Sequence, residues 1–209
     1  MSLLKQILIF ICGLFFVALG ISCAVTSNLG TATISSVPYV LNLRYPISLG
    51  TLTFIFNMMF FLGQILILRK QFKSIQVLQI LVAGIFGFFI DFTMYFITKV
   101  TPEMYVGQLA MAIVGINCMA FGIALQLIGN LVMVPGDGIV KAIAANWNFE
   151  FGLTKTCFDV TCVLFASILS WCYFGEFYGI REGTLLFALF TGVTTRFFVK
   201  QLTTKSQLR

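Results

Sequence analysis

The stretch ICGLFFVALGISCAVTSNL at residues 11–29 returns in altered form as IVGINCMAFGIALQLIGNL at residues 113–131. Aligning residues 11–62 with 113–164 without a gap gives ten identities, where an apolar chain of this composition gives roughly four by chance. The matches include three glycines and an Asn-Leu pair, and Asn57 is matched by its near-isostere Asp159. We therefore interpret the chain as two repeats offset by 102 residues.

The composition predicts an all-α membrane protein. Hydrophobic residues make up 59% of the 209 residues and charged residues only 10%, whereas a soluble domain carries about 25% charged residues. We expect one transmembrane domain over residues 1–209, with the first repeat at about 6–98 and the second at about 106–200. Six segments are long enough to cross a bilayer at about 20 residues each. They are residues 6–26, 48–68, 77–98, 106–127, 153–174 and 183–200.

Two equivalent stretches, residues 28–47 and 130–150, are interrupted by Gly, Pro and polar residues. Each can hold a short helix of about 10–12 residues, which is too short for a bilayer of about 30 Å. The two stretches either cross fully, which gives eight spans, or enter and leave on the same side.

Basic residues favour the second option. With six spans and two re-entrant segments, the face with both termini holds nine basic residues, and the other face holds Arg44, Lys99 and Arg181. Such a bias predicts that both termini are cytoplasmic, and three spans per repeat make the repeats inverted. The sequence thus predicts a polytopic helix bundle with six transmembrane helices, two re-entrant short helices and two inverted repeats. The nine basic residues are Lys5, Arg69, Lys70, Lys73, Lys141, Arg196, Lys200, Lys205 and Arg209.

The second short stretch carries the most chemistry, in Pro135-Gly-Asp-Gly138 and Lys141. Glycines flanking Asp137 allow a close approach of the backbone to a ligand, and charges at membrane depth usually face the bundle interior. We therefore expect Asp137 and Lys141 to face a polar cavity. The alternative is that Asp137 only caps the helix and Lys141 reaches the cytoplasmic surface.

Asp159 and its repeat partner Asn57 lie at equivalent depths from opposite faces, so we expect both to line the seam between the repeats. Alternatively, Asp159 forms a local ion pair with Lys155, four residues earlier.

Three further polar residues complete the candidate substrate-binding set, and a fourth is a separate candidate. Asn28 and Asn130 follow the first span of each repeat, where their simplest role is to bond backbone groups that the ending helix frees; direct ligand contact is the alternative. Ser35 occupies the position that matches Asp137. Asp91, inside an apolar span, is a candidate proton or cation site.

The sequence lacks the residues that several classes of protein function require. The chain has no His, no nucleotide-binding glycine motif, and six Cys without metal-ligand spacing. We expect no enzymatic activity, no catalytic residues, no cofactor and no metal. Its net charge of +6 lies at the cytoplasmic rim, so we expect the lipid bilayer and a small solute as partners, and no nucleic acid.

Residues 48–57 and 135–138 resemble the YitT/YczE group of bacterial integral membrane proteins, over roughly residues 6–200. The chain is nearer the short YczE-like branch, because no cytoplasmic domain follows residue 200. The resemblance implies a bacterial inner-membrane location and a transport-type role, without a substrate or residue roles.

Two functions stay open at this point. The first is a carrier or permease for a small polar or zwitterionic solute, because inverted-repeat transporters bind substrates where the repeats meet. The second is a non-transporting subunit or scaffold, which requires a homo-oligomer or a partner membrane protein. A face of small residues such as Gly84, Gly87, Gly107 and Gly115 could pack against that partner.

Overall fold

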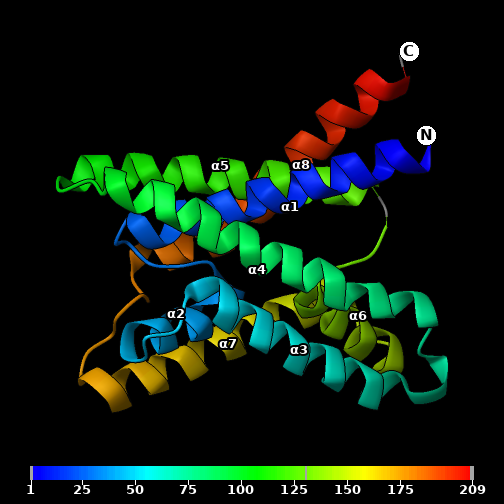
Figure 1. The fold of residues 1–209 in the computed structure, drawn as a ribbon, viewed down its shortest axis with the longest axis horizontal. Coiled ribbons are helices and arrows are strands. Elements are labelled where there is room, and N and C mark those ends of the chain that lie inside the picture. The colour runs from blue at the N-terminus through cyan, green and yellow to red at the C-terminus, as the bar shows by residue number, and fades with distance from the viewer. Residues whose placement is uncertain (1, 130, 208–209) are drawn as a thin grey trace. The chain divides into compact units, whose positions relative to one another are not determined.

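The computed structural model describes residues 2–129 and 131–207, and over these residues the chain is all-α without strands (Figure 1). The α-helices are α1 (Leu3–Thr26), α2 (Ser36–Arg44), α3 (Leu49–Leu68), α4 (Leu78–Ile97), α5 (Tyr105–Gly129), α6 (Pro135–Trp147), α7 (Phe151–Phe174) and α8 (Glu182–Gln207). Short 3-10 turns η1 (Thr33–Ser35), η2 (Arg69–Gln71), η3 (Ser74–Val77) and η4 (Thr98–Val100) extend or precede them.

Six helical stretches in the described part of the chain are long and apolar enough to cross a membrane. They confirm the predicted all-α fold with six spans, and the chain is therefore an integral membrane protein. Their bounds lie within a few residues of the predicted ones. They are Leu3–Thr26, Leu49–Gln71, Ser74–Val100, Tyr105–Gly129, Phe151–Phe174 and Glu182–Thr203.

The two interrupted stretches each contain a short helix, as predicted. α2 has 9 residues and α6 has 13, so they are roughly 13 and 20 Å long at 1.5 Å per residue. Pro135 suits the first position of α6, because its missing N–H has no intrahelical partner there. Asn148 ends α6 in the left-handed conformation, with φ of 54°. The re-entrant course of both stretches stays a prediction.

The chain forms two compact units, and each unit combines segments from both repeats. Unit 1 comprises Met1–Ala32, Phe89–Leu131 and Tyr178–Arg209, and unit 2 comprises Thr33–Phe88 and Val132–Phe177. Unit 1 thus contains α1, α5 and α8, and unit 2 contains α2, α3, α6 and α7. The boundary between the units falls within α4.

In unit 1, α1 and α5 lie side by side and α8 packs against α5 (Figure 1). Glycines set the close approach: a Cβ on Gly13 would lie 2.7 Å from the Gly122 carbonyl oxygen, and one on Gly20 would lie 2.7 Å from that of Gly115. In the alignment of the two repeats, Gly13 corresponds to Gly115 and Gly20 corresponds to Gly122. Each contact therefore maps onto the other, as in an interface between two-fold-related partners.

The segment after α1 is non-helical and almost entirely buried. Asn28 adopts the left-handed conformation, with φ of 56°. The Leu29 carbonyl accepts a hydrogen bond of 2.7 Å from the Gly183 N–H, and the Thr31 N–H donates to Thr184 Oγ1 at 3.2 Å. These bonds satisfy buried polar backbone groups and attach the segment to the first turn of α8.

Unit 2 shows the same reciprocity between elements. α2 packs against α3 and α7, and α6 also packs against α3 and α7. In the alignment of the two repeats, α2 corresponds to α6 and α3 corresponds to α7. The contact of α3 with α6 is therefore equivalent to the contact of α7 with α2.

Candidate binding site

The predicted site residues are divided between the two units. Ser35, Asn57, Asp137, Lys141 and Asp159 belong to unit 2. Asn28 and Asp91 belong to unit 1, and Asn130 lies outside the described residues. The arrangement of the site is therefore described for unit 2.

Lys155 on α7 joins the two aspartates predicted for the site. Its Nζ lies 3.2 Å from Asp137 Oδ1 on α6 and 2.8 Å from Asp159 Oδ1 one turn along α7. The side chains of Lys155, Asp137 and Asp159 are 28%, 44% and 22% exposed. The local Lys155–Asp159 pair is thus present, and Lys155, rather than Lys141, is the cation at Asp137. With both carboxylates ionised, these three side chains carry one excess negative charge.

Asn57 on α3 caps α6 from outside that helix. Its side-chain Oδ1 accepts a hydrogen bond of 3.2 Å from the Gly136 N–H, and its Nδ2 donates to the Thr53 carbonyl at 2.9 Å. Val134, the residue before α6, provides no side-chain cap. Because the first N–H groups of a helix lack intrahelical partners, buried Asn57 satisfies one that the local sequence leaves open.

Comparison with protein families gives a match over nearly the whole chain. Residues 4–200 match DUF6198, a family of unknown function. The chain belongs to the DUF6198 family. None of the curated proteins and none of the solved structures matches it. The match does not name the YitT/YczE group, so that resemblance stays a prediction.

In this DUF6198 chain, two glutamines that the sequence reading passed over lie against the first turn of α6. Gln64 on α3 and Gln79 on α4 are 1% and 2% exposed. A Cβ on Gly138 would lie 2.6 Å from Gln64 Oε1 and 3.1 Å from Gln79 Oε1. The sequence does indicate these residues, because a glutamine inside an apolar span is unusual: polar side chains at membrane depth are costly and usually functional.

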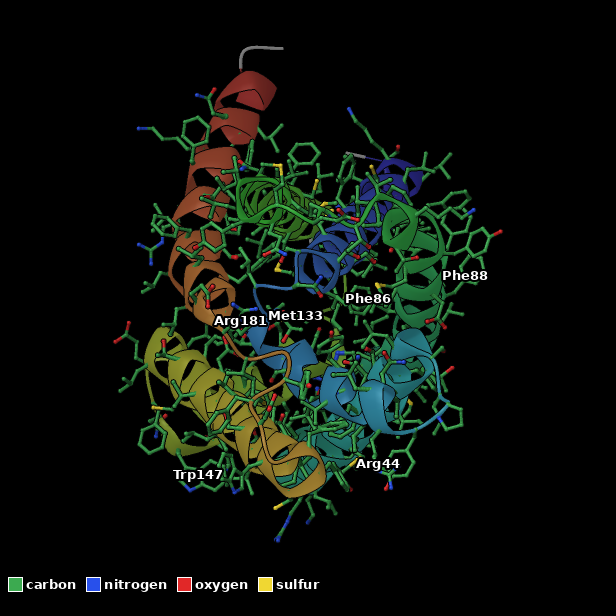
Figure 2. The ribbon with its side chains drawn as sticks, turned by 90° about the vertical axis from the view of Figure 1, so that its left-hand side faces the viewer. Arg44, Phe86, Phe88, Met133, Trp147 and Arg181 are labelled. Carbon is green, nitrogen blue, oxygen red and sulfur yellow. The ribbon has the colours of Figure 1, made fainter. Side chains whose placement is uncertain are left out.

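Lys141 lies further along α6, beside a hollow of about 440 Å³. Trp147 at the end of α6 is 52% exposed and is labelled at the lower left of Figure 2. Lys141 is exposed and shares the hollow with mostly apolar side chains. The lining residues are Met133, Lys141, Ala144, Ala145, Asn148, Phe149 and Phe151.

The other predicted site residues, Asn28, Ser35 and Asp91, lie away from the Lys155 ion pairs in the sequence. The Asn28 carbonyl accepts a hydrogen bond of 3.3 Å from Arg181 Nη1, where the chain enters α8 (Figure 2). This bond uses the Asn28 backbone, so the role of its side chain stays a prediction. Ser35 is buried at the end of η1, directly before α2. Asp91 lies in the part of α4 that belongs to unit 1 and is partly buried.

Two of the small residues suggested for a face that contacts a partner protein, Gly87 and Gly115, pack against other helices of the same chain. A Cβ on Gly87 would lie 2.8 Å from the Gly50 carbonyl oxygen in unit 2. A Cβ on Gly115 would lie 3.0 Å from both Cys23 Cβ and Phe187 Cζ in unit 1. Since these glycines pack against helices of the same chain, they are not free to contact another protein.

Proposed function

We propose that this DUF6198 protein is a non-enzymatic carrier of the bacterial inner membrane, with cytoplasmic termini, that binds a small polar or zwitterionic solute. The observation that carries the proposal is the bridging of Asp137 and Asp159 by Lys155, beside a helix start that Asn57 caps. Asn57 and Asp159 are each the ninth residue of their helices, so they lie roughly 12 Å from the helix starts at 1.5 Å per residue. In a bilayer core of about 30 Å, that depth is near the midplane.

The reciprocal contacts support inverted repeats. Equivalent residues of the two repeats make equivalent contacts in both units. In unit 1 this is the contact between α1 and α5, and in unit 2 the contact of α3 with α6 is equivalent to that of α7 with α2. Inverted-repeat transporters bind solutes near the midplane beside short or broken helices. In this chain α2 and α6 are the short helices, and α6 carries Asp137.

A non-transporting subunit is the alternative. Gly87 and Gly115, two of the four small residues that could have formed its partner face, pack inside the chain. We therefore favour the carrier.

A first test measures ligand-induced stabilisation of the purified protein. We expect that a solute which raises the melting temperature does so through the aspartates, so Asp137→Asn and Asp159→Asn abolish the shift while expression and monodispersity are retained. Because Lys155 pairs with both aspartates, each single substitution leaves Lys155 one carboxylate partner, so we expect the fold to be retained. Glu182→Gln is the matched control, because Glu182 pairs with Arg181 at the exposed start of α8.

A second measurement separates carrier from subunit. Reconstituted alone in liposomes, a carrier exchanges external radiolabelled solute against the same solute inside. Binding that survives both aspartate substitutions contradicts this site and directs attention to Asp91. Binding without exchange contradicts the carrier and supports the subunit.

A further inference from the structure

The buried carboxamides of Gln64 and Gln79 converge on one point of α6. Both Oε1 atoms lie within about 3 Å of the position that a Cβ of Gly138 would occupy. They come from different helices, α3 and α4, and belong to the same unit as α6. A Cβ at position 138 would require the end of at least one of these side chains to shift.

Neither glutamine oxygen has a hydrogen-bond partner among the residues that the structure describes. A buried acceptor without a donor is unfavourable, and such groups in native proteins call for an explanation, such as a bound molecule. Both side chains are at least nine-tenths buried, so bulk water does not compensate them. Two buried acceptors without a hydrogen-bond partner among the described residues therefore lie at the start of α6, together with the Gln79 Nε2 donor, which lies 3.2 Å from the same Cβ position.

The donors at the same helix start are already used. The Gly136 N–H bonds to Asn57, and the N–H groups of Asp137 and Gly138 bond to the Val134 carbonyl at 3.0 and 2.9 Å. A helix N-terminus commonly binds anions through free N–H groups, but these three are engaged. The first turn of α6 is thus poorly suited to an anion.

The charged side chains favour the same kind of ligand. Two aspartates share one lysine at Asp137, the residue next to Gly138, so with both carboxylates ionised this three-residue cluster has one excess negative charge. Lys141, one turn further along α6, is exposed. An excess of negative charge and of acceptors is complementary to a cation that carries N–H donors.

We propose that unit 2 binds a cationic solute with N–H donors, such as a primary ammonium compound, and that Gln64 and Gln79 accept its hydrogen bonds. This inference rests on the proposed carrier function and narrows its solute class from polar or zwitterionic to cationic. The excess charge of the Asp137–Lys155–Asp159 cluster attracts the cation, and the two carboxamides select for N–H groups.

The test uses the full-length purified protein and three salts at equal ionic strength: ethylammonium chloride, tetramethylammonium chloride and sodium acetate. Ethylammonium has charge and donors, tetramethylammonium has charge alone, and acetate has the opposite charge. We expect ethylammonium to raise the melting temperature by several degrees, tetramethylammonium to raise it less, and acetate to leave it unchanged, because a ligand that binds only the folded state stabilises it.

Gln64→Met and Gln79→Met, made separately, remove each carboxamide at nearly constant volume. Without ligand, each variant should unfold at the wild-type temperature or above it, because an unpartnered acceptor is lost. Each should bind ethylammonium about tenfold more weakly, the loss expected for a hydrogen bond to a charged group. Gln108→Met in α5, whose side chain bonds the Pro102 carbonyl at 3.5 Å, is the control and should bind like wild type.

Three results would overturn the inference: stabilisation by acetate above that by ethylammonium, equal effects of the two cations, or unchanged ethylammonium binding in both glutamine variants. A lower melting temperature of both variants without ligand, together with unchanged binding, would assign the glutamines a structural role instead. Ethylammonium binding through the glutamines without exchange in liposomes supports this site and contradicts the carrier. Exchange of an anion in the absence of ethylammonium binding supports the carrier and contradicts this site.

Discussion

At the scale of single residues, the two repeats use the same pair of positions to hold α6. Thr53 and Asn57 on α3 are matched, at an offset of 102, by Lys155 and Asp159 on α7. On α3 the pair is neutral, and Asn57 bonds the α6 backbone. On α7 the pair is charged, and Lys155 bonds the Asp137 side chain. One helix start is therefore held by a neutral contact from one repeat and by an ionic contact from the other.

The neutral contact gives a prediction about stability. Asn57→Ala leaves the Gly136 N–H without its buried acceptor, so we expect a loss of about 1–2 kcal/mol in the free energy of unfolding. Asn117→Ala in α5 is the control, because Asn117 makes the same bond to a carbonyl four residues back but is exposed. Its effect should stay within about 0.5 kcal/mol.

Chemical denaturation in detergent micelles measures both variants. Equal effects of the two substitutions would show that the α6 cap is unimportant. Asn57→Asp keeps the accepting oxygen and should recover part of the loss.

At the scale of elements, α1 and α5 approach closely because glycines face backbone across their contact. A Cβ on Gly122 would lie 2.6 Å from both the Gly13 carbonyl oxygen and the Val17 amide nitrogen. Backbone atoms cannot move aside as a side-chain end can, so a methyl group here must push the helices apart.

Gly122→Ala should therefore destabilise the protein by about 1–3 kcal/mol, the usual cost of overpacking. Gly192→Ala in α8 provides the contrast, because no atom of the described residues lies within 4 Å of a Cβ at that position. Alanine is a better helix former than glycine by up to about 1 kcal/mol, so the control should be neutral or stabilising. Thermal unfolding of the two variants compares them; a Gly122→Ala protein as stable as wild type would refute close packing of α1 on α5.

The elements were also the level at which the sequence was most informative. Apolar runs of about 20 residues predicted the six long helices, and Gly, Pro and Asn marked both short ones, because these residues act locally. The partners of the site side chains were harder to predict. Lys155 lies four residues from Asp159 on the same helix but 18 residues from Asp137, and only the packing of α6 against α7 brings it to Asp137. Gln64 and Gln79 were overlooked because they stand alone in apolar runs, where spacing says nothing about which helix faces them.

At the scale of the whole molecule, the distribution of basic residues predicts the orientation. Six spans with cytoplasmic termini leave Lys99 and Glu176 outside and the cluster Arg69, Lys70 and Lys73 inside. In a variant without its six cysteines, a single Cys at position 99 or 176 should react with an impermeant maleimide added to intact cells. A single Cys at position 70 should react only after permeabilisation. External labelling at position 70 would contradict both the orientation and the inverted repeat.

The division of each repeat between the two units has a consequence for biosynthesis. α1 leaves the ribosome before its main packing partner α5, which follows about 100 residues later, a delay of about 5–20 s at typical synthesis rates. During that interval Gly13 and Gly20 face lipid or the insertion machinery instead of a helix. Unit 1 also includes α8, which extends to Gln207. Unit 1 is thus completed only after α8 has been made, when all the helices of unit 2 have already left the ribosome.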